Sequence, residues 1–564
     1  MRSPWHIAVI SVITLAACAP SPGGGAPPSE PVQSSVRHGG TLRLAWAVEP
    51  DTLGPKFVGG SGTAEYQNLF SATLALLDLT GAPRPLLAAE IPTQANGGWI
   101  VNPDGTMITT YRLRPNAKWH DGMPLTAQDF VFAFEVYTDR ELPVLKKSPE
   151  NLMESVEAQD DSTVVIRWRE PYVGANVLGF EQLVPLPRHH LETKYRTNKA
   201  NFTTGQEWTT AYISTGPFKV ERWTPGIGVL ATANMDFAIG PPKLDAIDIR
   251  FIPDPNTEVA NLLAGEVDMI NSPGVRVKEA VIARDQWSTS GDGYIKTWST
   301  GAPYIHWQFR EAPNWQRAIA DFRVRQALLH AIDREGLNEA INLGFAPMAH
   351  AFVSPEDPLF PEVDRAVTKY SFDPNRSAAL MAEAGWQRPP GGGPATNAAG
   401  QTFDADLYST ISQGQAATIM ADNWKTAGVN TKLLILSLAQ SRDAEFASSF
   451  NAASATNRPL GQDYFVWTAK EFPTPENRWS GLNAGSFFDS EVDRLQNVRM
   501  TSLVEDDRRR ATIALMKRMT DVVGPSPVLY SVEVVAARSY VVGPAGRAAQ
   551  SGVTWNVHEW EVTR

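Results

Sequence analysis

Residues 111–134 read YRLRPNAKWHDGMPLTAQDFVFAF, and several kinds of local structure follow one another within them. Tyr111 and Leu113 alternate with polar neighbours, as residues of a half-buried strand do. Residues 115–116 (Pro-Asn) and 120–122 (His-Asp-Gly) then supply turn residues, which end that pattern. We therefore predict a strand that runs directly into a turn.

A capped helix is predicted after the turn. Thr126 is a favourable N-cap residue. Asp129, three positions later, forms a near variant of the capping box and suits the positive end of the helix dipole. Phe130, Val131 and Phe134 add an apolar stripe at helical spacing. The residues alone thus predict strand, turn and capped helix, in that order.

The same stretch resembles the signature segment of the family-5 extracellular solute-binding proteins, the peptide, nickel and opine binders of ABC importers. That segment typically reads LRxGxKFHDGxPLTAxDVVFSF. Further phrases that resemble the family occur in the same order along the chain, at residues 39–53, 184–191, 214–226, 262–269 and 324–334. The resemblance covers nearly the whole mature chain. It implies that His120 and Asp121 build a lobe and do not contact a ligand.

Composition narrows the classes of partner. The chain has 564 residues, 43% of them hydrophobic, which is enough for a large core and for more than one lobe. Lys and Arg number 50 against 61 Asp and Glu, for a net charge of −11. Because phosphate binding requires a basic surface, this balance argues against nucleic acid as a partner.

The one cysteine, Cys18, lies in a segment typical of export. Arg2 precedes a short apolar run at residues 6–15, which is too short to span a membrane and suits a secretory signal. Residues 15–18 (Leu-Ala-Ala-Cys) resemble a bacterial lipobox, and residues 19–35 are rich in Pro, Gly and Ser, as a flexible tether is. We expect lipidation of Cys18 and anchoring to a membrane; the alternative is an ordinary signal with a chance cysteine.

The resemblance implies an α/β fold of the periplasmic-binding-protein type II kind, with two ligand-closing lobes and an extra lobe. A helix expected at 414–427 followed by a strand at 432–436 is consistent with an α/β lobe. The expected divisions are a signal peptide at 1–18, a tether at 19–38, lobe I at 39–75, 205–300 and 530–564, lobe II at 76–204, and lobe III at 301–529.

Other elements follow from periodicity and end signals. We expect strands at 41–48, 164–168, 184–191, 528–530 and 554–560, and helices at 67–79, 257–264, 322–334 and 374–384. Gly226 and Gly228 lack the third glycine and the helix of a dinucleotide site, so we interpret them as part of a hairpin turn.

No catalytic pattern is present. The chain has no G-x-S-x-G, H-E-x-x-H, Walker A or EF-hand motif, and His189 and His190 would point to opposite faces of a strand. We expect no enzyme activity, no metal site and no cofactor. The expected function is capture of a small polar solute for the permease of an ABC importer, by a monomer held outside the cytoplasm. The alternative is an exported hydrolase that acts on an extracellular oligomer.

The ligand site is expected in a cleft with aromatic walls and a few fixed polar groups. The candidate residues are Trp46, Tyr304, Trp307, Tyr464, Trp467, Lys470, Glu471 and Phe472. In peptide-binding relatives a phrase that resembles residues 467–473 reads WxADYPDP, and its aspartate pairs with the α-ammonium of the peptide. Lys470 occupies the spacing of that aspartate, and Glu471 is the nearest acid. A peptide, an opine and a sugar derivative therefore all stay open as ligands.

Overall fold

A computed structural model describes residues 39–57, 63–144, 148–179, 182–271, 273–311, 314–460, 467–546 and 552–564. The predicted signal peptide, the tether and Cys18 lie outside these residues, as does Tyr464. No helix in the described part of the chain combines the length and the hydropathy needed to cross a membrane.

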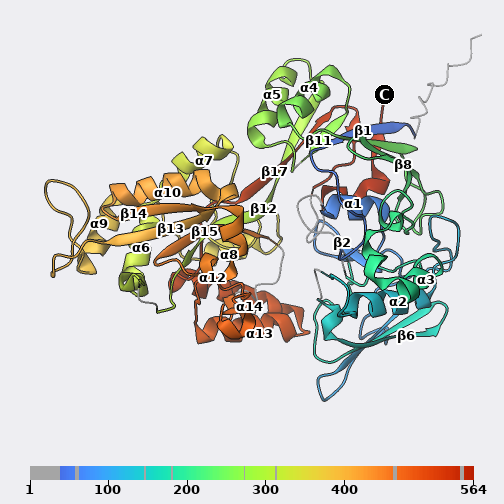
Figure 1. Ribbon diagram of the computed structural model, residues 1–564, viewed down its shortest axis with the longest axis horizontal. Coiled ribbons are helices and arrows are strands. Elements are labelled where there is room, and N and C mark those ends of the chain that lie inside the picture. Colours follow the sequence, from blue (N-terminus) through green and yellow to red (C-terminus); the bar gives the residue numbers. More distant parts are fainter. Residues whose placement is uncertain are drawn as a thin grey trace, which may run out of the picture. The chain divides into compact units, whose positions relative to one another are not determined.

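One large mixed sheet organises most of the described chain (Figure 1). Its strands lie in the order β14-β13-β15-β12-β17-β11-β1-β10-β9-β8, and β16 pairs with β12. Their bounds are β1 Thr41–Trp46, β8 Phe218–Thr224, β9 Gly228–Ala233, β10 Ala246–Phe251, β11 Met269–Asn271, β12 Gly293–Trp307, β13 Asp404–Thr410, β14 Asn430–Leu436, β15 Ala453–Pro459, β16 Ser526–Pro527 and β17 Ser531–Arg538. Both parallel and antiparallel pairs occur in it, which confirms the α/β class.

The long strand β12 joins two groups of strands within this sheet. Its first half, from Gly293 to Ser299, pairs with β17. Its second half, from Gly301 to Trp307, pairs with β15, and the register with β17 shifts between Ser299 and Gly301. The predicted boundary between lobes I and III, at 300/301, falls at this irregularity, and the lobe limits themselves stay a prediction.

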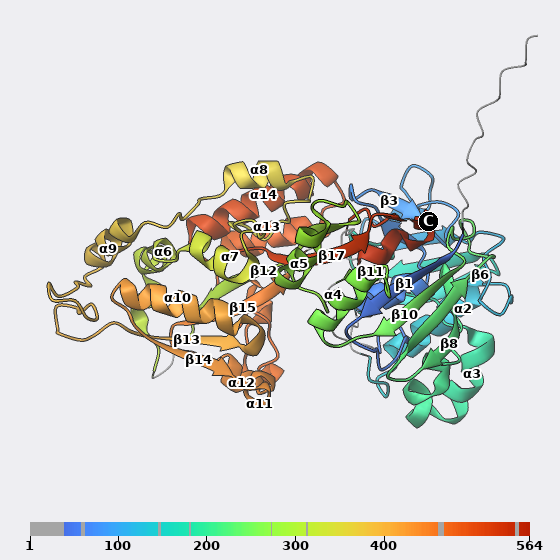
Figure 2. The same ribbon diagram turned by 90° about the horizontal axis from the view of Figure 1, so that it is seen from above.

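Helices cover both groups of strands. The sheet around β13 and β14 is covered by α10 Gly414–Thr426 (Figure 2). The other helices of this part are α6 Phe322–His330, α7 Arg334–Asn342, α8 Phe360–Ala366, α9 Pro374–Glu383, α11 Leu438–Arg442, α12 Ala444–Ala447, α13 Ser490–Thr501 and α14 Glu505–Asp521. The pair α4 Pro255–Ala264 and α5 Val277–Trp287 packs on β11, β12 and β17.

A second sheet contains the strand predicted from residues 111–134, and the predicted helix follows that strand in the chain. Its order is β4-β5-β7-β6, with bounds Trp99–Val101, Met107–Arg112, Thr163–Trp168 and Met153–Asp160. Helix α2, Ala127–Thr138, begins after Thr126, with the capping box in place. The Asp129 carboxylate accepts the Thr126 N–H at 2.9 Å and the Arg188 N–H at 3.1 Å. Burial raises the pKa of Asp129, and these hydrogen bonds oppose that rise.

Several other local predictions are confirmed. Helix α4 ends at Gly265, which has the left-handed φ of 76° that a C′ glycine supplies. Helix α9 begins after the N-cap Asp373. Gly226, with φ of 73°, lies in the turn between the antiparallel strands β8 and β9. The expected helix 322–334 is instead two helices, because Asp333 caps a new helix with its carboxylate on the Gly336 N–H.

The helix predicted at 67–79 is correct only for residues 67–70. Helix α1 spans Thr63–Phe70 and stops where the Phe70 carbonyl accepts the N–H of Gly216 at 3.0 Å. A side chain at Gly216 would lie 2.2 Å from the Phe70 carbonyl carbon, so this approach needs glycine. Residues that follow form β2, Ala75–Leu77, which pairs with β3, Pro83–Pro85.

Three strand predictions are also wrong. Residues 553–559 form a 3-10 helix, because the buried Glu65 carboxylate accepts the N–H groups of Val553 and Thr554 at its start. Residues 188–197 form helix α3, which carries His189 and His190 side by side along the chain. His189 is paired with Asp121 at 2.8 Å. Residues 528–530, predicted as a strand, lie between β16 and β17 and belong to neither.

Candidate ligand-binding site

The candidate rings on β12 lie on opposite faces of the strand, because they are three residues apart. Trp307 is 1% exposed, stacks on Trp424 at 5.9 Å and donates its indole N–H to Ser526 at 3.1 Å. Tyr304 faces the other side and contacts a different core cluster. The two rings therefore do not share one surface, and we leave Trp307 out of the proposed site.

Trp46 is likewise enclosed. Its ring meets Tyr66 edge-on at 4.3 Å, and its indole N–H donates to the Asn271 side chain at 2.6 Å. Only 3% of its surface is exposed. The polar tip of the ring is thus paired with Asn271, and the ring packs at the end of β1; we leave Trp46 out of the proposed site.

Tyr304 and Trp467 are the predicted aromatic residues that the structure brings together. Their ring centroids lie 6.2 Å apart, and both rings contact Phe352, at 5.2 Å from Tyr304 and 4.2 Å from Trp467. The Tyr304 hydroxyl hydrogen-bonds to His306 at 2.7 Å. Both rings are buried in this cluster, and the segment that follows in the chain begins at Trp467.

That segment, residues 467–487, is called the ligand segment here. It contains two short 3-10 turns, Ala469–Glu471 and Pro475–Asn477. Asn483 is fully buried at its centre and donates from its amide to the carbonyls of Thr468 at 3.3 Å and Phe487 at 2.8 Å. The same side chain accepts the Phe487 N–H at 3.1 Å. One buried amide thus closes the segment into a loop with a defined shape.

The predicted charged residues lie on this loop. Lys470 is exposed, and Glu471 and Phe472 are half-buried. The Glu471 carboxylate accepts the Leu482 N–H at 3.3 Å, and its backbone carbonyl accepts the Asn483 N–H at 2.9 Å. Burial raises the pKa of Asp493 on α13, and the Lys470 ammonium acts in the opposite direction. The loop therefore carries a carboxylate held by a backbone N–H next to an exposed ammonium group.

The sequence analysis missed two residues here: Arg310, which lies against this loop, and Trp479, which is part of it. Arg310 donates to the carbonyls of Ser448 at 2.6 Å and Pro473 at 3.3 Å, and its guanidinium carbon lies 5.0 Å from the ring centroid of Trp479. Burial lowers the pKa of Arg310. The position of Arg310 directly after a strand was the only local signal. Nothing local linked it to Trp479, because the contact depends on how the loop folds back.

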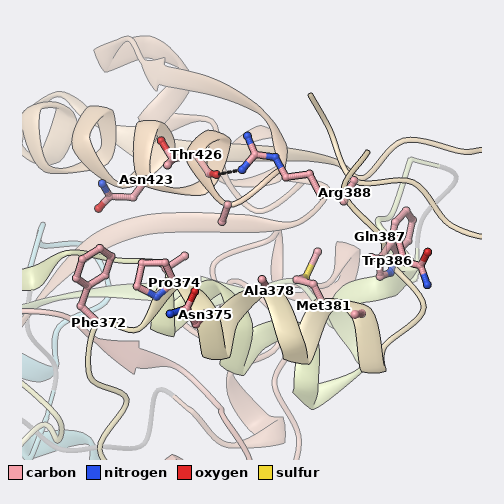
Figure 3. A pocket seen from close by; sticks show the side chains of 14 residues that line it. Phe372, Pro374, Asn375, Ala378, Met381, Trp386, Gln387, Arg388, Asn423 and Thr426 are labelled. Carbon is pink, nitrogen blue, oxygen red and sulfur yellow. Dashed lines mark hydrogen bonds between the residues drawn. The ribbon is translucent and has the colours of Figure 1, made fainter. Parts of the chain in front are cut away.

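A cavity of about 630 Å³ lies elsewhere, between α9 and α10 (Figure 3). Figure 3 shows Asn375, Ala378 and Met381 on one side and Asn423 and Thr426 on the other. Arg388 crosses toward α10 and donates to the Thr426 carbonyl at 2.7 Å. None of the predicted ligand residues that the structure describes lines this cavity. Within the described ranges, no group of three or more His, Cys, Asp or Glu side chains is placed to hold a metal ion.

Comparisons with known proteins agree with this architecture. The family model described as "Bacterial extracellular solute-binding proteins, family 5 Middle" matches residues 83–473. A putative ABC transporter peptide-binding protein of Brucella ovis is 30% identical over 297 residues, which cover 52% of each chain. The chain thus spans about half the length of this relative. The oligopeptide-binding protein AppA of Bacillus subtilis is 24% identical over 87% of this chain and 86% of its own.

Among solved structures, NikA from Brucella suis in complex with Fe(III)-EDTA matches with a TM-score of 0.74. The match has 19% sequence identity and covers 93% of this chain and 99% of that one. The fold is therefore that of the periplasmic binding proteins with mixed α/β lobes, as the sequence predicted.

Proposed function

Because this chain belongs to the bacterial extracellular solute-binding proteins of family 5, we propose that it captures a small polar solute outside the cytoplasm and delivers it to the permease of an ABC importer. The family match over residues 83–473 carries this proposal. The ligand segment and the strands β12 and β17 support it, since they provide a polar loop and a connection between two groups of strands.

The proposed ligand surface is the exposed side of the ligand segment. It comprises Lys470, Glu471 and Phe472, together with Arg310 and Trp479, above the buried pair Tyr304 and Trp467. Tyr464 stays in the proposal on its sequence position alone. A peptide-like solute is the first choice, because the Brucella ovis and Bacillus subtilis relatives carry peptide-binding names. An opine, a sugar derivative and a metal chelate are the other classes to test.

The decisive experiment is native mass spectrometry of the purified protein. A bound solute of defined mass, released intact on denaturation, is the expected result. A protein that never retains or accepts a solute, across a thermal-shift screen of peptides, opines, oligosaccharides and metal chelates, would contradict the proposal. Conversion of any of these compounds during overnight incubation would support the alternative, an exported hydrolase.

Its cellular setting is also a proposal. The lipobox-like residues 15–18 and the tether at 19–38 support a lipid anchor at Cys18, on the outer face of the cytoplasmic membrane or in the periplasm. A single acyl chain binds membranes only marginally, so stable anchoring requires several chains. We also propose that the protein acts as a monomer that docks on the permease.

A further inference from the structure

A guanidinium at the edge of the ligand segment has no carboxylate within ion-pair distance in the described part of the chain. Arg310 is half-buried and donates to two neutral carbonyls, which use two of its five N–H groups. The charge of Glu445 acts on it, but burial outweighs that effect and lowers the pKa of Arg310. A partly desolvated cation without an anion is unfavourable, because buried charges are normally paired.

The backbone holds an aromatic ring against this cation. Arg478 and Trp479 have φ of 55° and 61°, consecutive left-handed conformations that non-glycine residues rarely adopt. This geometry places the Trp479 ring over the Arg310 guanidinium. Backbone strain of this kind persists where the surrounding structure imposes it, often at ligand clamps. One face of the guanidinium is thus covered, and its remaining N–H donors lie in the plane that a carboxylate approaches.

The cation also lies within the reach of a small ligand that contacts Glu471. Pro473, whose carbonyl accepts from Arg310, is two residues beyond Glu471. Two residues of fully extended chain span at most about 7 Å. Within the described residues, Arg310 and Glu471 form no ion pair with each other, and each hydrogen-bonds to backbone groups instead.

We propose that Arg310, held against Trp479, recognises a carboxylate of the captured solute and so selects anionic or zwitterionic solutes. Arginine suits this role because its planar fork binds a carboxylate through two parallel hydrogen bonds. This inference rests on the proposed function of solute capture and adds the chemical class of the solute.

Calorimetry with trialanine and trialaninamide tests the proposal, since the two probes differ only in whether the carboxyl terminus is charged. Wild type should bind trialanine about ten- to a hundredfold more tightly than the amide, as a charge-assisted hydrogen bond predicts. R310Q should abolish that preference, and R310K should retain part of it. R365Q is the matched control, because Arg365 is an exposed cation on α8, outside the ligand segment, and should leave the preference unchanged.

The possible outcomes distinguish a failure of carboxylate recognition by Arg310 from a failure of the proposed solute capture. Equal binding of both probes by wild type would overturn the role of Arg310 and leave solute capture intact. Trialanine preference that survives in R310Q would do the same. If neither probe binds, the peptide-like ligand is contradicted, and citrate becomes the probe. A citrate-induced rise in melting temperature that R310Q loses and R365Q keeps would support the anion site, and an equal response in all three proteins would overturn it.

Discussion

Glu258 on α4 and Glu279 on α5 are buried carboxylic acids, and the charge of Glu279 is one of the causes that raise the pKa of Glu258 to about 8. Burial is the largest cause, and the charge of Asp254 adds to it. Both Glu258 carboxyl oxygens lack a hydrogen-bond partner in the described residues, as does Glu279 Oε2. The absence of a side chain at Gly274 leaves the room that the Glu258 carboxyl group occupies. These surroundings favour the neutral, protonated form of Glu258.

This pair predicts a pH-dependent stability. The folded pKa of Glu258 lies above the ordinary value of 4.5, so the native state binds more protons than the unfolded chain between these values. The free energy of unfolding should therefore fall as pH rises from about 4.5 to about 8. Two other charged groups lie beside this pair. Lys278 pairs with Glu279 at 3.3 Å, and Asp254 acts on Glu258.

E258Q should remove that dependence, because glutamine stays neutral at every pH. Urea unfolding at pH 5 should show similar stability for wild type and variant. At pH 9 the variant should be more stable by a few kcal/mol, on the order of 1.4 kcal/mol for each pH unit between the two pKa values. E266Q, at an exposed position just beyond α4, is the control and should follow wild type at both pH values. A wild type whose stability stays level from pH 5 to 9 would contradict the protonated state.

The fully buried ion pair of Lys56 and Glu150 makes a second prediction. Lys56 Nζ lies 2.6 Å from Glu150 Oε2, and the other oxygen of Glu150 accepts the Leu183 N–H at 2.6 Å. E150Q leaves the lysine charge buried without its anion and should cost about 3–5 kcal/mol of unfolding free energy. E491Q, which breaks the exposed pair with Arg494, should cost less than about 1 kcal/mol. Similar small losses in both variants would show that Lys56 is not charged in the folded protein.

Glu471 and Lys470 report the sign of the group that binds near them. For a solute with an ammonium group, E471Q should lower the affinity well over tenfold, because truncating one side of a partly desolvated charge pair costs about 2–5 kcal/mol. K470Q should then have little effect. If instead an anionic group of the solute binds here, K470Q should lower the affinity strongly and E471Q should have little effect. Calorimetry on one identified solute decides, and changes below about 0.5 kcal/mol in both variants would exclude this part of the loop as the anchor.

We predict that the two groups of strands, which β12 and β17 connect, close on the solute when it binds. Solute at 100 times its dissociation constant should stabilise the protein by roughly 2.7 kcal/mol. The register irregularity between Ser299 and Gly301 lies between the two strand pairings of β12, and we expect the change in backbone angles there. Small-angle scattering should show a smaller radius of gyration with solute. A solute that raises the melting temperature but leaves the scattering curve unchanged would argue against closure.

Lipidation of Cys18 is tested by cell fractionation. Wild type should be found with the membranes, and C18S should be released, because acyl chains supply the anchor. Mass spectrometry of the wild-type N-terminus should show the added lipid mass. Wild type found wholly in the soluble fraction would contradict the anchor and favour an ordinary signal peptide.

Local sequence was sufficient where the forces are local. Thr126 and Asp129 specify the start of α2 because the cap and its partner are three residues apart. The C′ glycine at 265 and the N-cap at Asp373 act within one helical turn in the same way. The family resemblance added the α/β class and the solute-binding function, which no single motif in the chain encodes.

The sequence predicts where the ligand segment lies, but it does not show which of the candidate aromatic residues are covered by other side chains. Strand alternation alone separates Tyr304 from Trp307, yet only the packing of each face shows that Trp307 is covered by Trp424. In the same way, the indole of Trp46 is satisfied by Asn271, which lies on a strand far along the chain.

What the sequence by itself determined is therefore the set of locally capped elements, their α/β class and the loop that carries Lys470 and Glu471. Only the tertiary structure decided that Arg310 lies on Trp479, that Glu258 is buried beside Glu279, and that Glu65 begins a 3-10 helix at Val553. These contacts join residues that neither periodicity nor end signals relate. They form only when the sheet brings distant segments together, and burial then sets the charge and pKa of each side chain.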